Sequence, residues 1–157
     1  MSEHNSVDKF DIDSHERICE VINLAMKGAE KGDHVMLCNA FHEKARMYGE
    51  VHGGRYDTPI KVFFALCNNF QLGKDLSLRK GKSYRYHIIS VTRVGGAAMV
   101  MVAEDGCWGS AAFVDFFTVT LNEGKWQITN KTFAYTGGVI PEKVLAWEPP
   151  PELLDHV

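Results

Sequence analysis

Apolar residues near the N-terminus recur every three or four positions and predict an amphipathic helix. The stripe consists of Ile18, Val21, Ile22, Ala25 and Ala29. Asp13 and Glu16 have the spacing of a capping box, so we expect the helix to begin near Asp13. Gly32 follows the stripe at the position of a C-terminal cap, and the helix should end there.

A second helix and a short hairpin are predicted next. Asp33 can cap a short helix, which we expect to end at His42. Two short strands, over 45–51 and around 55–56, are joined through the glycine pair Gly53-Gly54. Such a pair suits a tight turn, so the segment predicts a hairpin.

The third predicted helix opens at Thr58-Pro59. Threonine caps a helix, and proline at the first helical position loses no hydrogen bond that the helix needs. The helix is apolar almost all round and should therefore be buried. Its apolar residues are Ile60, Val62, Phe63, Phe64, Leu66 and Cys67.

The segments after residue 83 predict an antiparallel meander of four strands. The strands span 84–94, 97–104, 110–121 and 125–135. Their connections carry glycine-rich hairpin turns. The polar segment 71–83 before the meander is expected to be either a solvated loop or a rim of a cavity.

The length of 157 residues predicts one domain over 1–157, with residues 1–12 mobile. The tail 141–157 contains WEPPPELL and is too rich in proline to continue the sheet. We expect this tail to lie on a surface or to reach a partner subunit.

Composition narrows the classes of partner. Hydrophobic residues make up 45% and charged residues 24%, which is typical of a soluble globular protein. With 17 Lys and Arg against 20 Asp and Glu, and no basic stripe, nucleic acid is not an expected partner. No apolar stretch approaches the roughly 18 residues that would cross a bilayer, so we expect no membrane association and a cytoplasmic location.

Metal and disulfide chemistry are not expected either. The four cysteines lie far apart without a C-x-x-C spacing and are interpreted as reduced packing residues. The stretch HEKAR at His42 lacks the second histidine of a zinc-binding helix. We therefore expect no metal and no cofactor.

A carboxylate, Asp115, lies between Val114 and Phe116 in an otherwise apolar strand. A buried ionised carboxylate costs several kcal/mol unless it is paired. Side chains alternate between the faces of a strand, so the register of the last hairpin decides which way Asp115 points. Apolar matching selects the pairs Leu121–Trp126, Val119–Ile128, Phe117–Asn130 and Asp115–Thr132.

This register turns Asp115 toward the core, with Asn130 and Thr132 as its expected hydrogen-bond neighbours. Asp115 would then line a pocket, or alternatively bond a backbone bulge or a helix end. The register also places Val114, Phe116 and Phe133 on the outer face, beside Lys131. These apolar residues predict a homodimer through that face.

The order of elements resembles the nuclear transport factor 2-like superfamily, in which a cone of curved sheet wraps around three helices. The likeness covers about 16–135 and includes FHEKARMYG, the strand with Asp115, and GKWQITNKTF. Within the superfamily the chain resembles the branch named putative lumazine-binding, related to SnoaL-like cyclases. The resemblance implies an α+β fold with a cone-shaped, mixed and mainly antiparallel sheet, also described as cystatin-like.

The resemblance further implies a pocket inside the cone and suggests its residues. Asp115 and His42 are the candidates for proton transfer, although His42 also suits a capping or core role. The aromatic side chains of the pocket wall could come from Tyr48, Phe63, Trp108 and Phe117. Asn130 and Thr132 could supply polar groups to the same wall. Core packing is the alternative for Phe63 and Phe117, and we expect Trp108 at a rim.

Three functions stay open on the sequence alone. The first is binding of a small apolar or conjugated molecule, with Asp115 as the polar anchor. The second is a cofactor-independent isomerase, dehydratase or cyclase in which Asp115 and His42 share the acid and base roles. The third is a dimeric protein-interaction module that uses the outer sheet face.

Overall fold

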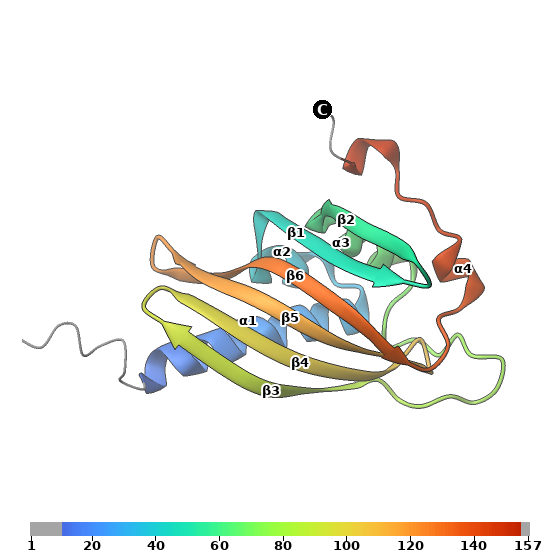
Figure 1. Ribbon diagram of the computed structural model, residues 1–157, viewed down its shortest axis with the longest axis horizontal. Helices are drawn as coiled ribbons and strands as arrows, with labels where there is room; N and C mark the ends of the chain where they lie inside the picture. Colours follow the sequence, from blue (N-terminus) through green and yellow to red (C-terminus); the bar gives the residue numbers. More distant parts are fainter. Residues whose placement is uncertain (1–10, 155–157) are drawn as a thin grey trace, which may run out of the picture.

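The computed structural model describes residues 11–154 as an α+β fold in which helices pack on one face of a six-stranded sheet. The predicted mobility of residues 1–12 falls almost wholly outside this range. Figure 1 shows α1, α2 and α3 behind the curved sheet, with the C-terminal segment beside its end.

Three helices precede the meander, as predicted. α1 spans Ile12–Lys31, α2 spans His34–Ala40 and α3 spans Ile60–Asn69. Gly32 ends α1 with a φ of 68°, a left-handed conformation that glycine adopts without strain. Asp33 caps α2 by accepting a hydrogen bond from the Met36 backbone N–H at 3.1 Å.

Two helix starts differ from the prediction. The side chain of Asp11, not that of Asp13, caps α1 by accepting from the Ser14 backbone N–H. α3 begins at Ile60 with no side-chain cap, because Thr58 is still part of the preceding strand. The hydroxyl of Thr58 is therefore not used by the helix.

The sheet is mixed and open. Its strands are β1 (Phe41–Val51), β2 (Gly54–Pro59), β3 (Arg85–Val94), β4 (Ala97–Cys107), β5 (Ala111–Asn122) and β6 (Lys125–Gly137). They lie in the order β2-β1-β6-β5-β4-β3, so β2 and β3 form the two edges. β1 runs parallel to β6, and the other neighbouring strands are antiparallel.

β1 begins earlier than predicted. Phe41 has extended backbone angles and lies opposite Ile128 of β6, so α2 ends at Ala40. His42 is consequently a strand residue and not the last residue of a helix. This placement turns Phe41 into the core, where its ring contacts those of Phe64 and Phe117.

The core lies between the helices and the concave face of the sheet. Its fully buried side chains include Ile18 and Ile22 of α1, Ile60 of α3, and Phe117, Val119 and Ile128 of the sheet. Burial of each such side chain contributes about 1.5–3 kcal/mol. The four cysteines are all free thiols.

The predicted register of the last hairpin is correct near the turn and wrong beyond it. Leu121 lies opposite Trp126 and Val119 opposite Ile128, as expected. The register then shifts, because Thr118 pairs with Asn130 and leaves Thr129 as an extra residue. A one-residue bulge moves every later side chain of β6 to the other face.

The bulge changes the neighbours of Asp115. Phe117 lies opposite Lys131 and Asp115 lies opposite Phe133, so the expected pairs with Asn130 and Thr132 do not form. Phe133 therefore lies on the same inner face as Asp115 and not on the outer face.

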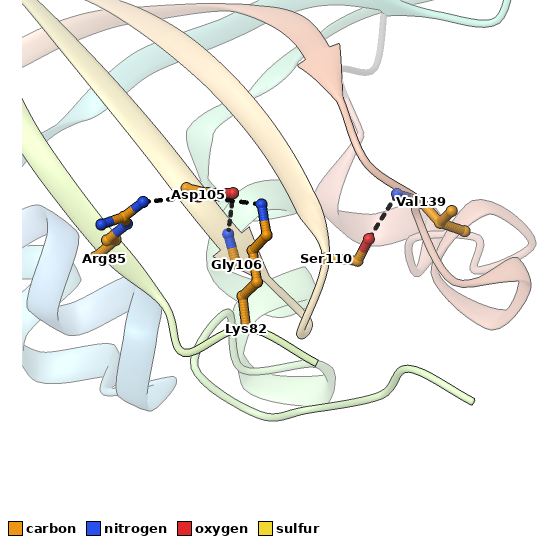
Figure 2. Close-up of polar contacts among 6 residues, drawn as sticks. All are labelled: Lys82, Arg85, Asp105, Gly106, Ser110 and Val139. Atoms are coloured by element: carbon orange, nitrogen blue, oxygen red, sulfur yellow. Dashed lines mark hydrogen bonds and ion pairs between the residues drawn. The ribbon is translucent and has the colours of Figure 1, made fainter. Parts of the chain in front are cut away.

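The C-terminal segment folds back onto the body instead of leaving it. β6 ends at Gly137, and Gly138 has a φ of 70°. Ser110 Oγ accepts a hydrogen bond from the Val139 backbone N–H at 3.0 Å, which ties this turn to the start of β5 (Figure 2). α4 (Glu142–Leu145) and a short 3-10 helix (Pro151–Leu153) follow.

Candidate functional site

A cavity of about 210 Å³ lies between the inner face of the sheet, α3 and the C-terminal segment. Most of its wall is apolar. From the body it is lined by Met47, Val51, Tyr56, Thr58, Val62, Phe63, Leu66, Leu72, Glu104, Cys107, Trp108, Phe113, Asp115, Lys131 and Phe133. From the C-terminal segment it is lined by Ile140, Val144, Leu145, Trp147 and Pro149.

An ion pair lies in the wall of this cavity. Lys131 Nζ donates to Asp115 Oδ1 at 2.9 Å, and the two residues are 4% and 0% exposed. Asp115 points toward the core by alternation along β5, and the bulge in β6 turns Lys131 toward the same face. Water cannot satisfy either charge at this depth, so each depends on the other.

Aromatic rings surround the ammonium group of Lys131. Its Nζ lies 4.7 Å from the ring centroid of Phe63, 5.4 Å from that of Phe117 and 5.9 Å from that of Phe133. These faces attract a cation electrostatically. Burial lowers the pKa of Lys131, but the Asp115 and Glu104 carboxyl groups more than offset this, and the pKa lies above its ordinary value. Lys131 is therefore a cation at neutral pH.

Glu104 of β4 is a third buried polar group, 5% exposed. Tyr84 Oη donates to Glu104 Oε2 at 3.0 Å, and Cys107 Sγ donates to the same oxygen at 3.6 Å. Burial, and next the nearby charge of Asp115, raise the pKa of Glu104 well above its ordinary value. This shift favours the protonated form of Glu104 beside the ion pair.

Two buried oxygens of residues that line the cavity have no hydrogen-bond partner, although the carboxyl groups of Asp115 and Glu104 lie close enough to share a proton. They are Asp115 Oδ2 and Thr58 Oγ1. An unpaired buried polar atom costs roughly 1–3 kcal/mol. A bound molecule that paired with them would recover this cost.

One end of the cavity is closed by the turn between β4 and β5. Trp108, with a φ of 53°, is 4% exposed, and its Nε1 donates to the Phe70 carbonyl at 2.9 Å. Its backbone exchanges hydrogen bonds with the segment 71–83, accepting from the Leu76 N–H and donating to the Leu72 carbonyl. Trp108 is thus an internal wall and not an exposed rim.

Hydrogen bonds and ion pairs of charged side chains outside the cavity stabilise the same end of the molecule. Asp105 accepts from the Gly106 backbone N–H at 2.9 Å and forms ion pairs with Lys82 and Arg85 (Figure 2). Asp75 accepts from the backbone N–H groups of Ser77 and Gly81. The segment 71–83 is therefore a folded border of the cavity, through Leu72.

Three of the residues proposed from the sequence line the cavity together: Asp115, Phe63 and Trp108. The others do not. His42 lies in a separate depression with His34 and Lys61, where its Nδ1 accepts from the Lys44 backbone N–H at 3.0 Å. Tyr48, Phe117, Asn130 and Thr132 are likewise not among the lining residues.

Sequence reasoning missed Lys131, Glu104, Thr58 and the C-terminal wall. Lys131 was assigned to the outer face because the bulge was not recognised. Glu104 occupies the end of a predicted strand, and nothing in its immediate sequence distinguishes it from a solvated acid. Thr58 has the sequence context of a helix cap, which concealed its place in the cavity.

Residues 11–154 contain neither a metal-binding cluster nor a helix that could cross a membrane. No group of three or more His, Cys, Asp or Glu side chains in this range is arranged to hold a metal ion. No helix in the same range is both long and apolar enough to span a membrane.

Comparison with solved structures identifies the fold. A nuclear transport factor 2-like protein of unknown function from Shewanella baltica OS155 is 24% identical, with a TM-score of 0.70 over 82% of this chain and 98% of the other. A similar protein from Methylobacillus flagellatus KT is 28% identical, with a TM-score of 0.69 over 82% and 97%. A ketosteroid isomerase-like protein from Erwinia carotovora atroseptica SCRI1043 is 13% identical, with a TM-score of 0.61 over 81% and 99%.

A comparison with curated proteins found no match. A family model described as "Putative lumazine-binding" matches residues 13–134, from the start of α1 to β6. This match covers most of the chain and includes Thr58, Glu104, Asp115 and Lys131. The chain therefore belongs to the putative lumazine-binding family, within the nuclear transport factor 2-like superfamily.

Proposed function

We propose that the protein binds a small, largely apolar ring compound that carries a hydrogen-bond donor. The observation that carries this proposal is the partly open apolar cavity, two of whose lining residues hold buried oxygens without a hydrogen-bond partner, Asp115 Oδ2 and Thr58 Oγ1. Small-molecule sites typically combine such apolar walls with a few placed polar groups.

The polar groups define which part of the ligand they would meet. A carboxylate oxygen only accepts hydrogen bonds, so the ligand group at Asp115 Oδ2 must be an N–H or O–H. Thr58 Oγ1 can donate or accept and therefore suits a neighbouring carbonyl or ring nitrogen. The rings of Phe63, Phe133 and Trp108 suit a flat conjugated body.

The lumazine of the family's name shares the flat ring and the N–H donors of this class but is more polar. We include it among the compounds to test. We propose binding and not proton transfer between Asp115 and His42, because these residues line different hollows.

Association of two copies through the outer sheet face stays a prediction. Val114 and Phe116 are half-buried in the single chain, whereas Phe133 belongs to the cavity. Light scattering of Phe116→Asp tests the dimer, which is excluded if wild type and variant have the same monomeric mass.

The experiment compares ligands that differ by one donor. Lumazine, naphthol and the methyl ether of naphthol are titrated into the full chain by calorimetry, with thermal shift as a second readout. Naphthol should bind roughly tenfold more tightly than its ether, because a hydrogen bond to a charged group contributes about 1.5–3 kcal/mol. Equal binding of the two, or binding of none of the three compounds, would contradict the proposal.

A matched pair of variants assigns the effect to the cavity. Thr58→Val removes the unpaired cavity hydroxyl and keeps the side-chain shape, whereas Thr132→Val makes the same change outside the cavity. Thr58→Val should weaken lumazine binding about fivefold without destabilising the free protein, and Thr132→Val should leave binding unchanged. Equal affinities for lumazine in the two variants would remove Thr58 from the site.

A further inference from the structure

The C-terminal segment supplies one whole side of the cavity wall. Its contribution consists of Ile140, Val144, Leu145, Trp147 and Pro149. All five residues lie beyond residue 134, where the family match ends. This side of the wall is therefore not part of what the family model describes.

The segment is attached to the body at one end only. Tyr135 Oη donates to the Gly138 carbonyl, and the Val139 N–H donates to Ser110 Oγ (Figure 2). Within the described residues, each hydrogen bond made by residues 140–154 stays inside the segment. Beyond Val139, apolar contacts of Ile140 and Val144 therefore hold the segment to the body.

The point of attachment is suited to a hinge. Gly137 and Gly138 follow each other at the end of β6, and rotation about this pair would break the hydrogen bond from Val139 to Ser110. A segment fixed by a short hinge and a few apolar contacts opens locally at much lower cost than the sheet.

We infer that residues 140–149 form a hinged lid whose opening admits the ligand and whose apolar inner side selects the part of the ligand that lies away from Asp115. The selection of a ligand by the lid rests on the proposed function, whereas the opening motion of the lid does not. The body residues Asp115 and Thr58 meet the donor end of the ligand, and the lid, through lining residues such as Trp147, meets an apolar end.

The motion can be measured without any ligand, because two buried thiols differ in one respect. Cys107 lines the cavity, whereas Cys67 is equally buried but does not line it. Opening of the lid should expose Cys107 alone, and global unfolding should expose both. The rate of modification of each thiol by methyl methanethiosulfonate is followed by peptide mass spectrometry on the full chain.

Two valine substitutions in the same segment form the matched pair. Val144 is 8% exposed and lines the cavity, and Val139 is 69% exposed. Val144→Asp should hold the lid open and raise the rate at Cys107 at least tenfold, with the rate at Cys67 unchanged. Val139→Asp should leave both rates at their wild-type values. The milder Val144→Ala should also raise the rate of modification at Cys107. It replaces Val144→Asp as the test variant if Val144→Asp exposes both thiols.

The outcomes separate the lid from the proposed function. Unchanged modification of Cys107 in Val144→Asp, or parallel acceleration of Cys107 and Cys67 in both Val144 variants, would overturn the lid whatever the protein binds. Faster modification of Cys107 alone supports the lid even if lumazine and naphthol fail to bind. Where naphthol binds, its association rate should be at least fivefold higher in Val144→Ala than in Val139→Asp, and equal rates would exclude a gating role.

Discussion

Replacing Lys131 with methionine removes the cation that lies 2.9 Å from Asp115 and keeps an unbranched apolar side chain beside Phe63. Asp115 is 0% exposed, so its carboxylate would lose its charged partner inside the protein. Removing one member of a buried ion pair costs about 3–5 kcal/mol. Since a typical domain is stable by about 5–15 kcal/mol, the variant should lose a third or more of its free energy of unfolding.

A double-mutant cycle tests this reasoning by urea denaturation at neutral pH. Replacing both partners, by Asp115→Leu with Lys131→Met, should bring the free energy of unfolding back to within about 2 kcal/mol of wild type. The exposed Lys125 lies on the same strand, and Lys125→Met should change the free energy of unfolding by less than about 0.5 kcal/mol. A Lys131→Met variant as stable as Lys125→Met would show that the ion pair is not the buried electrostatic unit described here.

Three more outcomes are expected. The pKa of Glu104 is raised in the folded state above its ordinary 4.5, so the unfolded chain releases a proton that the folded chain keeps. Wild-type stability should therefore fall as pH rises above about 4.5, by up to about 1.4 kcal/mol per pH unit, and Glu104→Gln should remove this decline in a pH series of urea titrations. Gly138→Ala should lower the free energy of unfolding by roughly 2 kcal/mol or more in the same titration, because a Cβ there would lie 2.1 Å from the Ser110 carbonyl oxygen at a φ of 70°. A decrease below about 0.5 kcal/mol would contradict the tight turn. Gly49→Ala should lower the free energy of unfolding by about 1–3 kcal/mol, measured by thermal denaturation, because its Cβ would lie 2.4 Å from the Phe133 ring and push that ring into the cavity. An unchanged melting temperature would count against this packing.

The order of elements could be predicted because local signals and the final structure agree. Helical spacing of apolar residues, Gly32 as a cap and the glycine turns of the meander each act over a few residues. The inward direction of Asp115 also followed from alternation along β5. Phe113, Asp115, Phe117 and Val119 are all in phase on one face, and no bulge interrupts them up to Val119.

The partner of Asp115 could not be found by extending the register from the turn. Trp126 and Ile128 are even-numbered inner residues, whereas Lys131 and Phe133 are odd-numbered inner residues, so one extra residue must lie between them. This change of phase in the apolar pattern was the available signal. It was outweighed by the good apolar matches next to the turn.

The C-terminal wall of the cavity could not be predicted from the sequence for a different reason. Proline correctly excluded the tail from the sheet, but its place depends on residues more than fifty positions away, such as those of α3 that line the same cavity. Local rules carry no information about such contacts. For the site, the predictions that failed are therefore those that depend on long-range packing and on a single inserted residue, whereas the caps at Asp13 and Thr58 and the end of α2 were misplaced by a few residues.

The walls of the cavity come from opposite ends of the chain. Met47 and Thr58 belong to its first half, and Phe133 and Trp147 are close to its end. β1 pairs directly with β6, so a nascent chain on the ribosome cannot complete the cavity before residues up to Pro149 have emerged. A product truncated before Trp147 would lack one side of the wall, and under the proposed function a ligand would stabilise only chains that extend past this residue.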